Sequence, residues 1–397
     1  MLLNILHIIF YILFFYLGVS TLYFFIAAIA GKIRRQPAYA VHPDKKRIAV
    51  LIPSYREDDI IVTTATKARM HNYPTTHFEV FVAAHHLKKE TIDKLEAIPV
   101  KVQEVAFEIG SKARSLNKLL NSIPDNHFDI AIILDADNIM LPGCLEKVND
   151  AFQKGFRSVQ SHRIAKNKNT PVAVLDAISE EINNHLFRRG LRAMGFSATV
   201  IGSGMAFEFA KLREIYNKPG ILGNPACDRE VDFEVMRSGI QIEFIEDAYV
   251  LDEKVSRMEV FERQRTRWLE SQIIHLKLFF SQFNHIKKGK EYYNKLFISL
   301  IPPRVIILFV FLLVFLLFLL QKATGYPILA PSYTWWLLIT LMYIATLLLS
   351  IPAVHYSATT ARALIYVPVL MLSMLKALFK MKVSRKEFLH TPKAFNE

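Results

Sequence analysis

Long apolar runs lie at both ends of the chain, and a stretch of alternating apolar and polar segments separates them. Residues 2–30 contain no Lys, Arg, Asp or Glu. A bilayer core about 30 Å thick is crossed by roughly 20 apolar residues in a helix, so this run is long enough to span. It lacks the basic start of a signal peptide and is longer than one. We predict a transmembrane anchor over residues 1–31, with a buried core helix as the alternative.

Further apolar segments lie toward the C-terminus. The runs at about 304–321 and 335–354 are separated by a short stretch with Gly and Pro, which predicts a helical hairpin that crosses the membrane twice. The segment at 362–380 is also apolar, but it contains Lys376, and Pro368 would kink a helix there. We predict that this last segment is an interfacial or re-entrant helix.

Basic residues beside the apolar runs predict the orientation of the chain. Lys32, Arg34 and Arg35 follow the first run directly, and basic residues favour the cytoplasmic side of a span. We expect a multi-pass protein of the cell (inner or plasma) membrane, with a cytoplasmic domain over 32–285 and a C-terminal membrane region over 286–397. The tail should stay cytoplasmic because it is basic, with Lys380, Lys382, Arg385, Lys386 and Lys393.

The middle of the chain alternates strand-like and helix-like segments. Continuous apolar strands separated by helices indicate an α/β layer with a mostly parallel sheet whose two faces are covered. In such sheets, ligands bind beyond the carboxyl ends of the strands, so the polar residues there are candidates for a site. The expected strands are 47–55, 77–85, 100–107 and 128–137, and the expected helices include 57–71 and 112–122.

Composition and charge change the expected partners. Hydrophobic residues make up 52% of the 397 residues, and the excess lies at both ends. The formal net charge of +13 could suggest nucleic acid, but many basic residues flank apolar segments, where each attracts anionic lipid by about 1 kcal/mol. The sequence has no zinc-finger spacing and no RNA-binding aromatic motif. We therefore expect a lipid bilayer, and no nucleic acid, as partner, and Cys144 and Cys227 make no disulfide framework.

The segment LDADN (134–138) ends a buried strand with two acids. Asp135 and Asp137 offer hard oxygen ligands, and a divalent cation held by one or two carboxylates bridges to phosphates. The pattern therefore indicates a metal–phosphate site. The alternative is a turn that Asp137 or Asn138 caps.

Two shorter signals lie elsewhere in the domain. Lys112 stands at the start of a predicted helix and is either a binding residue or a solvated lysine. Gly202 and Gly204 flank Ser203, and glycines of this kind either let the backbone approach a ligand closely or form a plain turn.

Gln264, Arg267 and Trp268 are spaced at i, i+3 and i+4 in a predicted helix, so they share one face. Arg can bind a diphosphate through two parallel hydrogen bonds, and Trp offers a plane for a sugar ring. The alternative is an amphipathic helix on the bilayer surface with Trp268 as its anchor.

The segment CDREVDFE (227–234) contains four carboxylates at alternate positions, yet its apolar residues recur at helical intervals. On a helix, Asp228 and Asp232 share one side, with Asp228 nearer a ligand, whereas Glu230 and Glu234 are expected to be solvated. Asp228 is the candidate for chemistry. Its alternative role is a helix N-cap, since a helix could start at the next residue.

In this order along the chain, the segments resemble the membrane-bound family 2 glycosyltransferases, which include cellulose, chitin, hyaluronan and poly-N-acetylglucosamine synthases and ceramide glucosyltransferase. IPSYRED is similar to the family's Pro-x-Tyr-Asn-Glu element, with Arg56 in place of Asn. LDADN is similar to its Asp-x-Asp motif, GSGMAF to its acceptor-side Gly-Ser-Gly element, and QRTRW to its Gln-x-x-Arg-Trp motif. The resemblance implies a GT-A domain, a Rossmann-like α/β fold for nucleotide-diphospho-sugars, flanked by transmembrane helices.

The chain departs from the family pattern at two places. The family's late Thr-Glu-Asp corresponds to Asp228, which follows Ala226 and Cys227 instead of Thr and Glu. After the second strand, His85 and His86 stand where the family usually has an Asp that recognises uracil. Histidine can still hydrogen-bond or stack on a base, so the identity of the nucleotide stays open.

The resemblance implies inverting transfer from a nucleoside diphosphate sugar, UDP-GlcNAc or UDP-Glc, to a growing polysaccharide or glycan, with Mg²⁺ or Mn²⁺ as cofactor. Asp228 would be the general base, a role that typically contributes about a hundred- to ten-thousand-fold. Asp137 would hold the metal together with Asp135. The donor-binding residues would be Pro53, Tyr55, Glu57, Lys112, Asp135, Gln264 and Arg267, and the acceptor side would comprise Trp268, Gly202, Ser203 and Gly204.

Two other functions stay open. A lipid glycosyltransferase would make a single transfer to a membrane lipid, and enzymes of that type share the Gln-x-x-Arg-Trp motif. A catalytically inactive membrane subunit would bind nucleotide or a partner synthase chain. The two histidines and the missing Thr-Glu favour it, and the presence of Asp135, Asp137, Asp228, Gln264, Arg267 and Trp268 speaks against it. The membrane helices would form a channel, completed by a partner subunit, or hold the enzyme beside a lipid acceptor.

Overall fold

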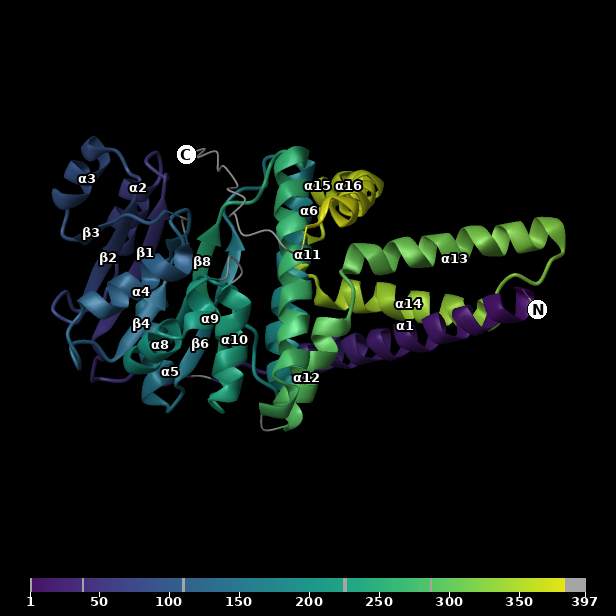
Figure 1. Ribbon diagram of the computed structural model, residues 1–397, viewed down its shortest axis with the longest axis horizontal. Coiled ribbons are helices and arrows are strands. Elements are labelled where there is room, and N and C mark those ends of the chain that lie inside the picture. The colour runs from purple at the N-terminus through teal and green to yellow at the C-terminus, as the bar shows by residue number, and fades with distance from the viewer. Residues whose placement is uncertain (1, 38, 109–110, 224–226, 286–287, 383–397) are drawn as a thin grey trace.

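The structure, a computed structural model, describes residues 2–37, 39–108, 111–223, 227–285 and 288–382. The basic tail residues Arg385, Lys386 and Lys393 lie outside the described residues. An α/β domain forms one end of the molecule, long apolar helices form the other, and a layer of helices lies between them (Figure 1).

Within the described residues, one eight-stranded sheet has the order β3-β2-β1-β4-β7-β6-β8-β5. β1 pairs in parallel with β2 and β4, and β2 pairs in parallel with β3, so the four predicted strands are confirmed. β1 is almost wholly buried because apolar layers cover both faces of the sheet. The strands are β1 Ile48–Tyr55, β2 Phe78–His85, β3 Lys101–Val105, β4 Ile130–Ile133, β5 Ile139–Met140, β6 Ser158–Ala165, β7 Met205–Glu208 and β8 Ile242–Asp252.

The second half of the sheet is mixed, in contrast to the mostly parallel prediction. β7 pairs antiparallel with β4 and β6, and β5 pairs antiparallel with β8. The sequence analysis missed these strands because β5 and β7 are short and because polar residues interrupt β6 and β8. In the antiparallel pair, Met205 at the start of β7 lies opposite Ile133 at the end of β4. The Gly-Ser-Gly segment before β7 therefore lies beside the acids that follow β4.

Amphipathic helices cover the two faces of the sheet. α4 buries Ala113, Leu116 and Leu120 on one face, and α2 and α5 bury Ile61 and Leu145 on the other. The predicted helix over 112–122 is confirmed. The helices of this domain are α2 Ile61–Ala68, α3 Lys89–Glu96, α4 Lys112–Ser122, α5 Cys144–Gln153, α8 Phe209–Tyr216, α9 Pro219–Leu222 and α10 Cys227–Arg237.

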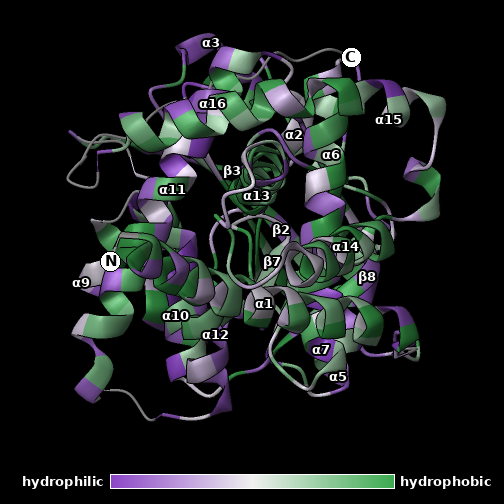
Figure 2. Cartoon of the chain, turned by 90° about the vertical axis from the view of Figure 1, so that its right-hand side faces the viewer, coloured by the Kyte–Doolittle hydropathy of each residue, from purple (hydrophilic) through white to green (hydrophobic). Residues whose placement is uncertain are grey.

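The intermediate layer contains two long helical segments. α6, the π-helical turn η1 and α7 follow one another without interruption, and α11 stands apart from them in Figure 2. The layer comprises α6 Pro171–Asn184, η1 His185–Gly190, α7 Leu191–Ala193, α11 Met258–Ser281, η2 Phe283–His285 and α12 Lys290–Leu300.

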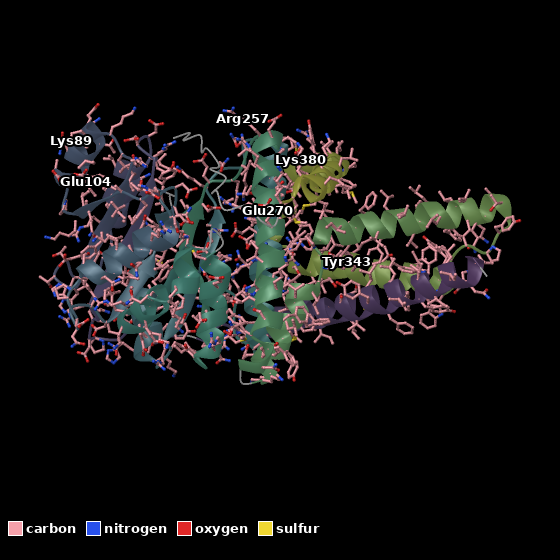
Figure 3. All side chains as sticks on the ribbon, viewed as in Figure 1. Lys89, Glu104, Arg257, Glu270, Tyr343 and Lys380 are labelled. Atoms are coloured by element: carbon pink, nitrogen blue, oxygen red, sulfur yellow. The ribbon has the colours of Figure 1, made fainter. Side chains whose placement is uncertain are left out.

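Four described helices are long and apolar enough to cross a membrane. α14 lies along α1 and beside α13 in both views (Figures 1 and 2). Large apolar side chains of α1, such as Ile12 and Phe15, are about two-thirds exposed, which suits a lipid environment. Tyr343 of α14 lies far from Lys89 and Glu104 at the opposite end of the molecule (Figure 3).

The fourth apolar helix, α16, runs across the other three: it is seen end-on in Figure 1 and lengthwise in Figure 2. Pro368 stands in the first turn of α16, where proline is tolerated, so it begins this helix and does not kink it. The apolar region comprises α1 Leu2–Ile33, α13 Arg304–Thr324, α14 Tyr333–Ser350, η3 Ala353–His355, α15 Ala358–Ala363, η4 Leu364–Tyr366 and α16 Val367–Lys380.

The close contact between α1 and the π-helical turn depends on a glycine, Gly190, which has no side chain. A Cβ atom on Gly190 would lie 2.5 Å from the carbonyl oxygen of Ala27, and His185 Nε2 lies 2.9 Å from the carbonyl oxygen of Ala28. Small residues of this kind let two helix backbones approach closely. We therefore expect Gly190→Ala to lower the melting temperature of the detergent-solubilised protein by several degrees, since overpacking typically costs about 1–3 kcal/mol.

The matched control is Gly18→Ala in α1, where a Cβ atom meets no heavy atom within 4 Å. This variant should melt at or slightly above the wild-type temperature, because alanine favours the helix. Equal melting temperatures for both variants would show that the contact at Gly190 contributes nothing.

Candidate active site

Three segments that are far apart in the sequence meet at the ammonium group of Lys112. This group lies 2.7 Å from Asp135 Oδ1 and 3.4 Å from Asp228 Oδ1. It also donates a hydrogen bond of 2.6 Å to the carbonyl oxygen of Gly202. The predicted acids, the predicted lysine and the Gly-Ser-Gly segment are therefore brought together, and Lys112 is a partner of all three.

The charges around Lys112 are not balanced. Burial by itself would lower the pKa of Lys112, but Asp135 and Asp228 outweigh it and raise that pKa above its usual value. Burial raises the pKa of Asp135, and the neighbouring carboxylates of Asp137 and Asp228 add to the rise, although Lys112 opposes it. These three acids, the carboxylate cluster, carry more negative charge than one lysine neutralises, so the site favours additional cations.

The geometry of the second acid suits a metal shared with a phosphate. Asn138 is fully buried and donates hydrogen bonds to Asp137 Oδ1 at 3.1 Å and to Asp252 Oδ1 at 2.9 Å, so it fixes the Asp137 side chain. In the part of the chain that the structure describes, no group of three or more His, Cys, Asp or Glu side chains could hold a metal ion. A divalent cation on Asp137 and Asp135 would therefore take further oxygen ligands from a diphosphate, as Mg²⁺ commonly does.

The Gly-Ser-Gly loop is held in place by a residue that the sequence analysis missed. Ser203 is fully buried, and its hydroxyl accepts a hydrogen bond of 3.0 Å from the backbone N–H of Asp135. Gln160 of β6, also fully buried, donates to the Ser203 carbonyl oxygen at 2.9 Å and accepts from the backbone N–H of Ile201 at 3.1 Å. A lone Gln in a strand gives no signal in the sequence, because its partners come from another part of the chain.

Gly202 allows the loop backbone to touch Asp228. Its φ of +83° lies in the left-handed region, and an added Cβ atom would lie 2.2 Å from Asp228 Oδ2. Only glycine combines this conformation with so close an approach.

α10 begins at Cys227, so Asp228 lies in its first helical turn and the helix starts earlier than the sequence suggested. The family-motif position Ala226 lies outside the described residues. Burial, followed by the charge of Asp228, raises the pKa of the Cys227 thiol well above its usual value. The Cys227 Sγ atom lies 3.8 Å from Asp228 Oδ1, so a neutral thiol stands where the family has a carboxylate.

Two other acids of α10 form structural ion pairs. Asp232 is buried and accepts a hydrogen bond of 2.6 Å from the ammonium of Lys295. The prediction that Glu234 is solvated is wrong, because this residue is buried between Lys218 at 2.5 Å and Arg237 at 2.9 Å. Neighbouring basic residues, which no local pattern predicts, compensate its charge. Asp228 is 37% exposed and lines the cavity, so it is more available to a ligand there than Asp232 and Glu234, whereas Glu230 does not line the cavity.

The predicted residues of α11 all face the same cavity. Burial lowers the pKa of Arg267, and the carboxylate cluster opposes that effect, which places its guanidinium near the three acids. The amide oxygen of Gln264 is buried and has no hydrogen-bond partner among the described residues. Trp268 is 37% exposed, and its ring lies 4.0 Å from the guanidinium carbon of Arg265. Arg265 itself is paired with Asp176 of α6.

The end of β1 forms another wall of the site. Pro53, Tyr55 and Glu57 line the cavity together with His85. His85 is buried, and its ring centroid lies 4.8 Å from that of Tyr55 and 4.5 Å from that of His86. Burial lowers the pKa of His85, so its imidazole is neutral at pH 7. The position where the family has a base-reading Asp is thus occupied by the neutral imidazole of His85, in contact with the rings of Tyr55 and His86.

One cavity of about 1310 Å³ joins these groups. Its lining includes the carboxylate cluster, Lys112 and the predicted residues of β1 and α11. Gly202, Ser203 and Gly204 are not part of the lining, but the first two form hydrogen bonds with Lys112 and Asp135, which are. Beyond α6 and α11, the cavity continues to apolar residues of the long helices, among them Leu308, Leu347 and Leu370.

The fold defines the class of this protein, a GT-A-like α/β protein with a mixed sheet and flanking apolar helices. The mannosyltransferase PcManGT from Pyrobaculum calidifontis, in complex with GDP-Man and Mn²⁺, has the same fold, with a TM-score of 0.55 and 16% sequence identity. The match covers 95% of this chain and 98% of that chain.

The family follows from a second comparison. The model of the family described as "Glycosyltransferase like family 2" matches residues 43–271, and the chain belongs to this family. It is also 26% identical over 257 residues to the "Probable glycosyltransferase YdaM" of Bacillus subtilis (strain 168). That alignment covers 62% of this chain and 59% of the relative, so the chain spans less than two thirds of the relative's length.

The approach of Gly202 to Asp228 can be tested directly. We expect Gly202→Ala to reduce glycosyltransferase turnover at least a hundredfold, because the methyl group would displace the Asp228 carboxylate. The control is Gly143→Ala, where φ is +88° but a Cβ atom meets nothing within 4 Å. Both substitutions carry a left-handed backbone penalty of about 1–2 kcal/mol, so a similar loss of turnover in both variants would reject the proposed role of close approach.

Proposed function

We propose that this chain is a membrane-bound, inverting glycosyltransferase that moves a sugar from a nucleoside diphosphate sugar to a growing polysaccharide or glycan. The observation that carries the proposal is the contact of Lys112 with both Asp135 and Asp228, in a cavity that also contains Asp137 and Arg267. Cationic groups for a leaving diphosphate and a carboxylate for an attacking hydroxyl are thus found in one site.

The donor would bind on the side of the carboxylate cluster. Asp137, with Asp135, would hold Mg²⁺ or Mn²⁺, and the bound ion would neutralise the departing diphosphate. Lys112 and Arg267 would contribute fixed positive charge to the same leaving group. The complex of PcManGT with GDP-Man and Mn²⁺ supports this assignment. The residues that would cradle the nucleotide are Pro53, Tyr55, Glu57 and Gln264.

Asp228 would act as the general base. Its side chain is 37% exposed, and its Oδ1 atom lies 3.4 Å from the ammonium of Lys112. The acceptor hydroxyl would donate its proton to Asp228 as its oxygen bonds to the anomeric carbon and the diphosphate departs from the opposite face. Trp268 would stack on the acceptor sugar. The Gly202–Gly204 loop would position the Asp228 carboxylate through the close approach of Gly202.

The membrane arrangement is also a proposal. Residues 1–31 would anchor the chain, residues 32–285 would form the cytoplasmic catalytic domain, and α13 and α14 would span the membrane within the C-terminal region 286–397. The crosswise direction of α16 (Figures 1 and 2) supports an interfacial helix at 362–380. In this arrangement, the catalytic cavity opens toward the bilayer.

The test of the base uses Asp228→Asn in detergent with UDP-GlcNAc, UDP-Glc and GDP-Man as donors and released nucleoside diphosphate as the readout. Turnover should fall about a hundred- to ten-thousand-fold, while donor binding changes little. Asp228 lies inside the first turn of α10 and is not its N-cap, so Asn at this position removes no cap, and near-normal turnover would overturn the assignment of the base.

Two further variants complete that assay. Asp137→Ala should abolish metal-dependent release and weaken donor binding, because it removes the proposed metal ligand. Asp125→Ala removes an exposed acid outside the cavity and should behave like the wild type. No release with any donor by the wild-type protein would favour the inactive-subunit function.

A lipid acceptor is the second candidate, and the apolar part of the cavity favours it. Leu308, Leu347 and Leu370 line a path from the site toward the proposed bilayer, and such a lining suits an acyl or isoprenoid chain better than a hydrated polysaccharide. Product length after incubation of membranes with radiolabelled donor separates the two functions. A single-sugar lipid product would support the lipid acceptor, and long polymer would support the polysaccharide synthase.

A further inference from the structure

The helix α6 presents a polar stripe to the cavity. Asp176, Ser179, Glu180 and Asn183 are spaced at i, i+3, i+4 and i+7, so they share one face of the helix, and all four line the cavity. The stripe lines the same cavity as the carboxylate cluster and the apolar residues of the long helices, and α6 contributes no residue to the predicted donor site.

Most of the cations on this stripe are paired with acids. Arg163 Nε lies 2.7 Å from Glu180 Oε1. The ammonium of Lys254 is bound to Glu180 and lies 2.6 Å from Asp252 Oδ2. These pairs are buried, and a buried charge is tolerated only where an opposite charge compensates it.

Arg188 is the first exception. It lines the cavity and is only 2% exposed, yet its guanidinium donates to two neutral acceptors, the Thr199 carbonyl oxygen at 3.2 Å and Asn184 Oδ1 at 2.8 Å. No ion pair joins it to a carboxylate among the described residues. Burial lowers its pKa to about 10, so it still carries a positive charge at neutral pH.

The backbone explains why Arg188 points into the cavity. It lies in η1, the π-helical turn His185–Gly190 that continues α6. The extra residue of a π turn rotates the side chains that follow it, and such turns are frequent at functional sites.

Arg304 is the second exception. Its guanidinium donates to Asn183 Oδ1 at 2.6 Å, to the Ser179 carbonyl oxygen at 2.8 Å and to Ser179 Oγ at 2.7 Å. Within the described part of the chain, it too has no carboxylate partner at ion-pair distance. Asn183 and Asn184 are consecutive in α6 and bind Arg304 and Arg188 respectively, and both arginines line the cavity.

The position of Arg304 indicates where a compensating anion would come from. It is the first residue of α13, and the apolar run of that helix follows it directly. In the proposed membrane arrangement, this is the boundary between polar and apolar layers, the depth at which lipid phosphates lie. The nearby apolar lining could accommodate a lipid chain.

We propose that Arg188 and Arg304 bind the phosphate group of an acceptor lipid. The apolar chain of this lipid would lie beside Leu308 and Leu347, and its head group would extend toward Asp228. Arginine binds phosphate oxygens through paired hydrogen bonds. This inference rests on the second candidate function, transfer to a lipid acceptor, and narrows it to lipids that carry a phosphate group.

The experiment measures ligand binding to the purified, detergent-solubilised full chain in the absence of sugar nucleotide. The probes are dodecyl phosphate, dodecanol and inorganic phosphate. Wild-type protein should bind dodecyl phosphate at least tenfold more tightly than either other probe. Arg188→Gln and Arg304→Gln should each weaken this binding at least tenfold, and melting temperatures identify any variant that fails to fold. Arg188→Lys and Arg304→Lys, which keep the charge, should recover part of the affinity in a folded protein.

The matched control is Arg189→Gln. Arg189 adjoins Arg188 in the same π turn, lies outside the cavity lining and is 3.3 Å from Glu246. This variant should bind dodecyl phosphate within twofold of the wild type.

Three results would overturn the inference. The first is unchanged dodecyl phosphate binding in folded Arg188 and Arg304 variants. The second is equal affinity for inorganic phosphate, which would indicate a free anion and no lipid. The third is a parallel loss of UDP and GDP binding, which would assign both arginines to the donor. The binding measurement needs no turnover. It would therefore still test the lipid site if the Asp228 and Asp137 variants contradicted the proposed function.

Discussion

The site is organised around one partly buried ammonium group. Lys112 contacts the acid that ends a parallel strand, the acid in the first turn of α10 and a carbonyl oxygen of the loop before β7. A lysine in this position is stable only because the carboxylates around it outweigh the cost of its burial. Without Lys112 the two acids would lack this compensating charge and the loop carbonyl would lose a hydrogen bond, so the contact fixes the relative positions of the three segments.

A second set of charges continues from that centre toward the apolar helices. Paired cations such as Arg163 and Lys254 stabilise the junction between the α/β domain and α6. Arg188 and Arg304 have neutral partners instead. The polarity of the cavity thus changes in steps, from an excess of negative charge at the carboxylate cluster, through a cationic section, to an apolar end.

The departures from the family pattern are accommodated by packing. Cys227 is buried beside Asp228, and burial keeps its thiol neutral. His85 is buried behind Tyr55 and is also neutral at pH 7. Both replacements remove a negative charge from the neighbourhood of a site that already has an excess of carboxylates, which lowers the electrostatic cost of placing an anionic donor there.

The sequence by itself determined the apolar ends, the parallel strands from β1 to β4 and the segments that meet at the site, because hydrophobic periodicity and short motifs are local properties. It did not determine the antiparallel strands, the burial of Glu234 or the roles of Gln160, Arg188 and Arg304. These depend on partners distant in the chain: the antiparallel β7 carries the Gly-Ser-Gly loop to the end of β4, and polar side chains of α6 bind both arginines at the cavity. Only the tertiary structure selects such pairings, since a buried polar residue is stable only where another segment supplies its partner.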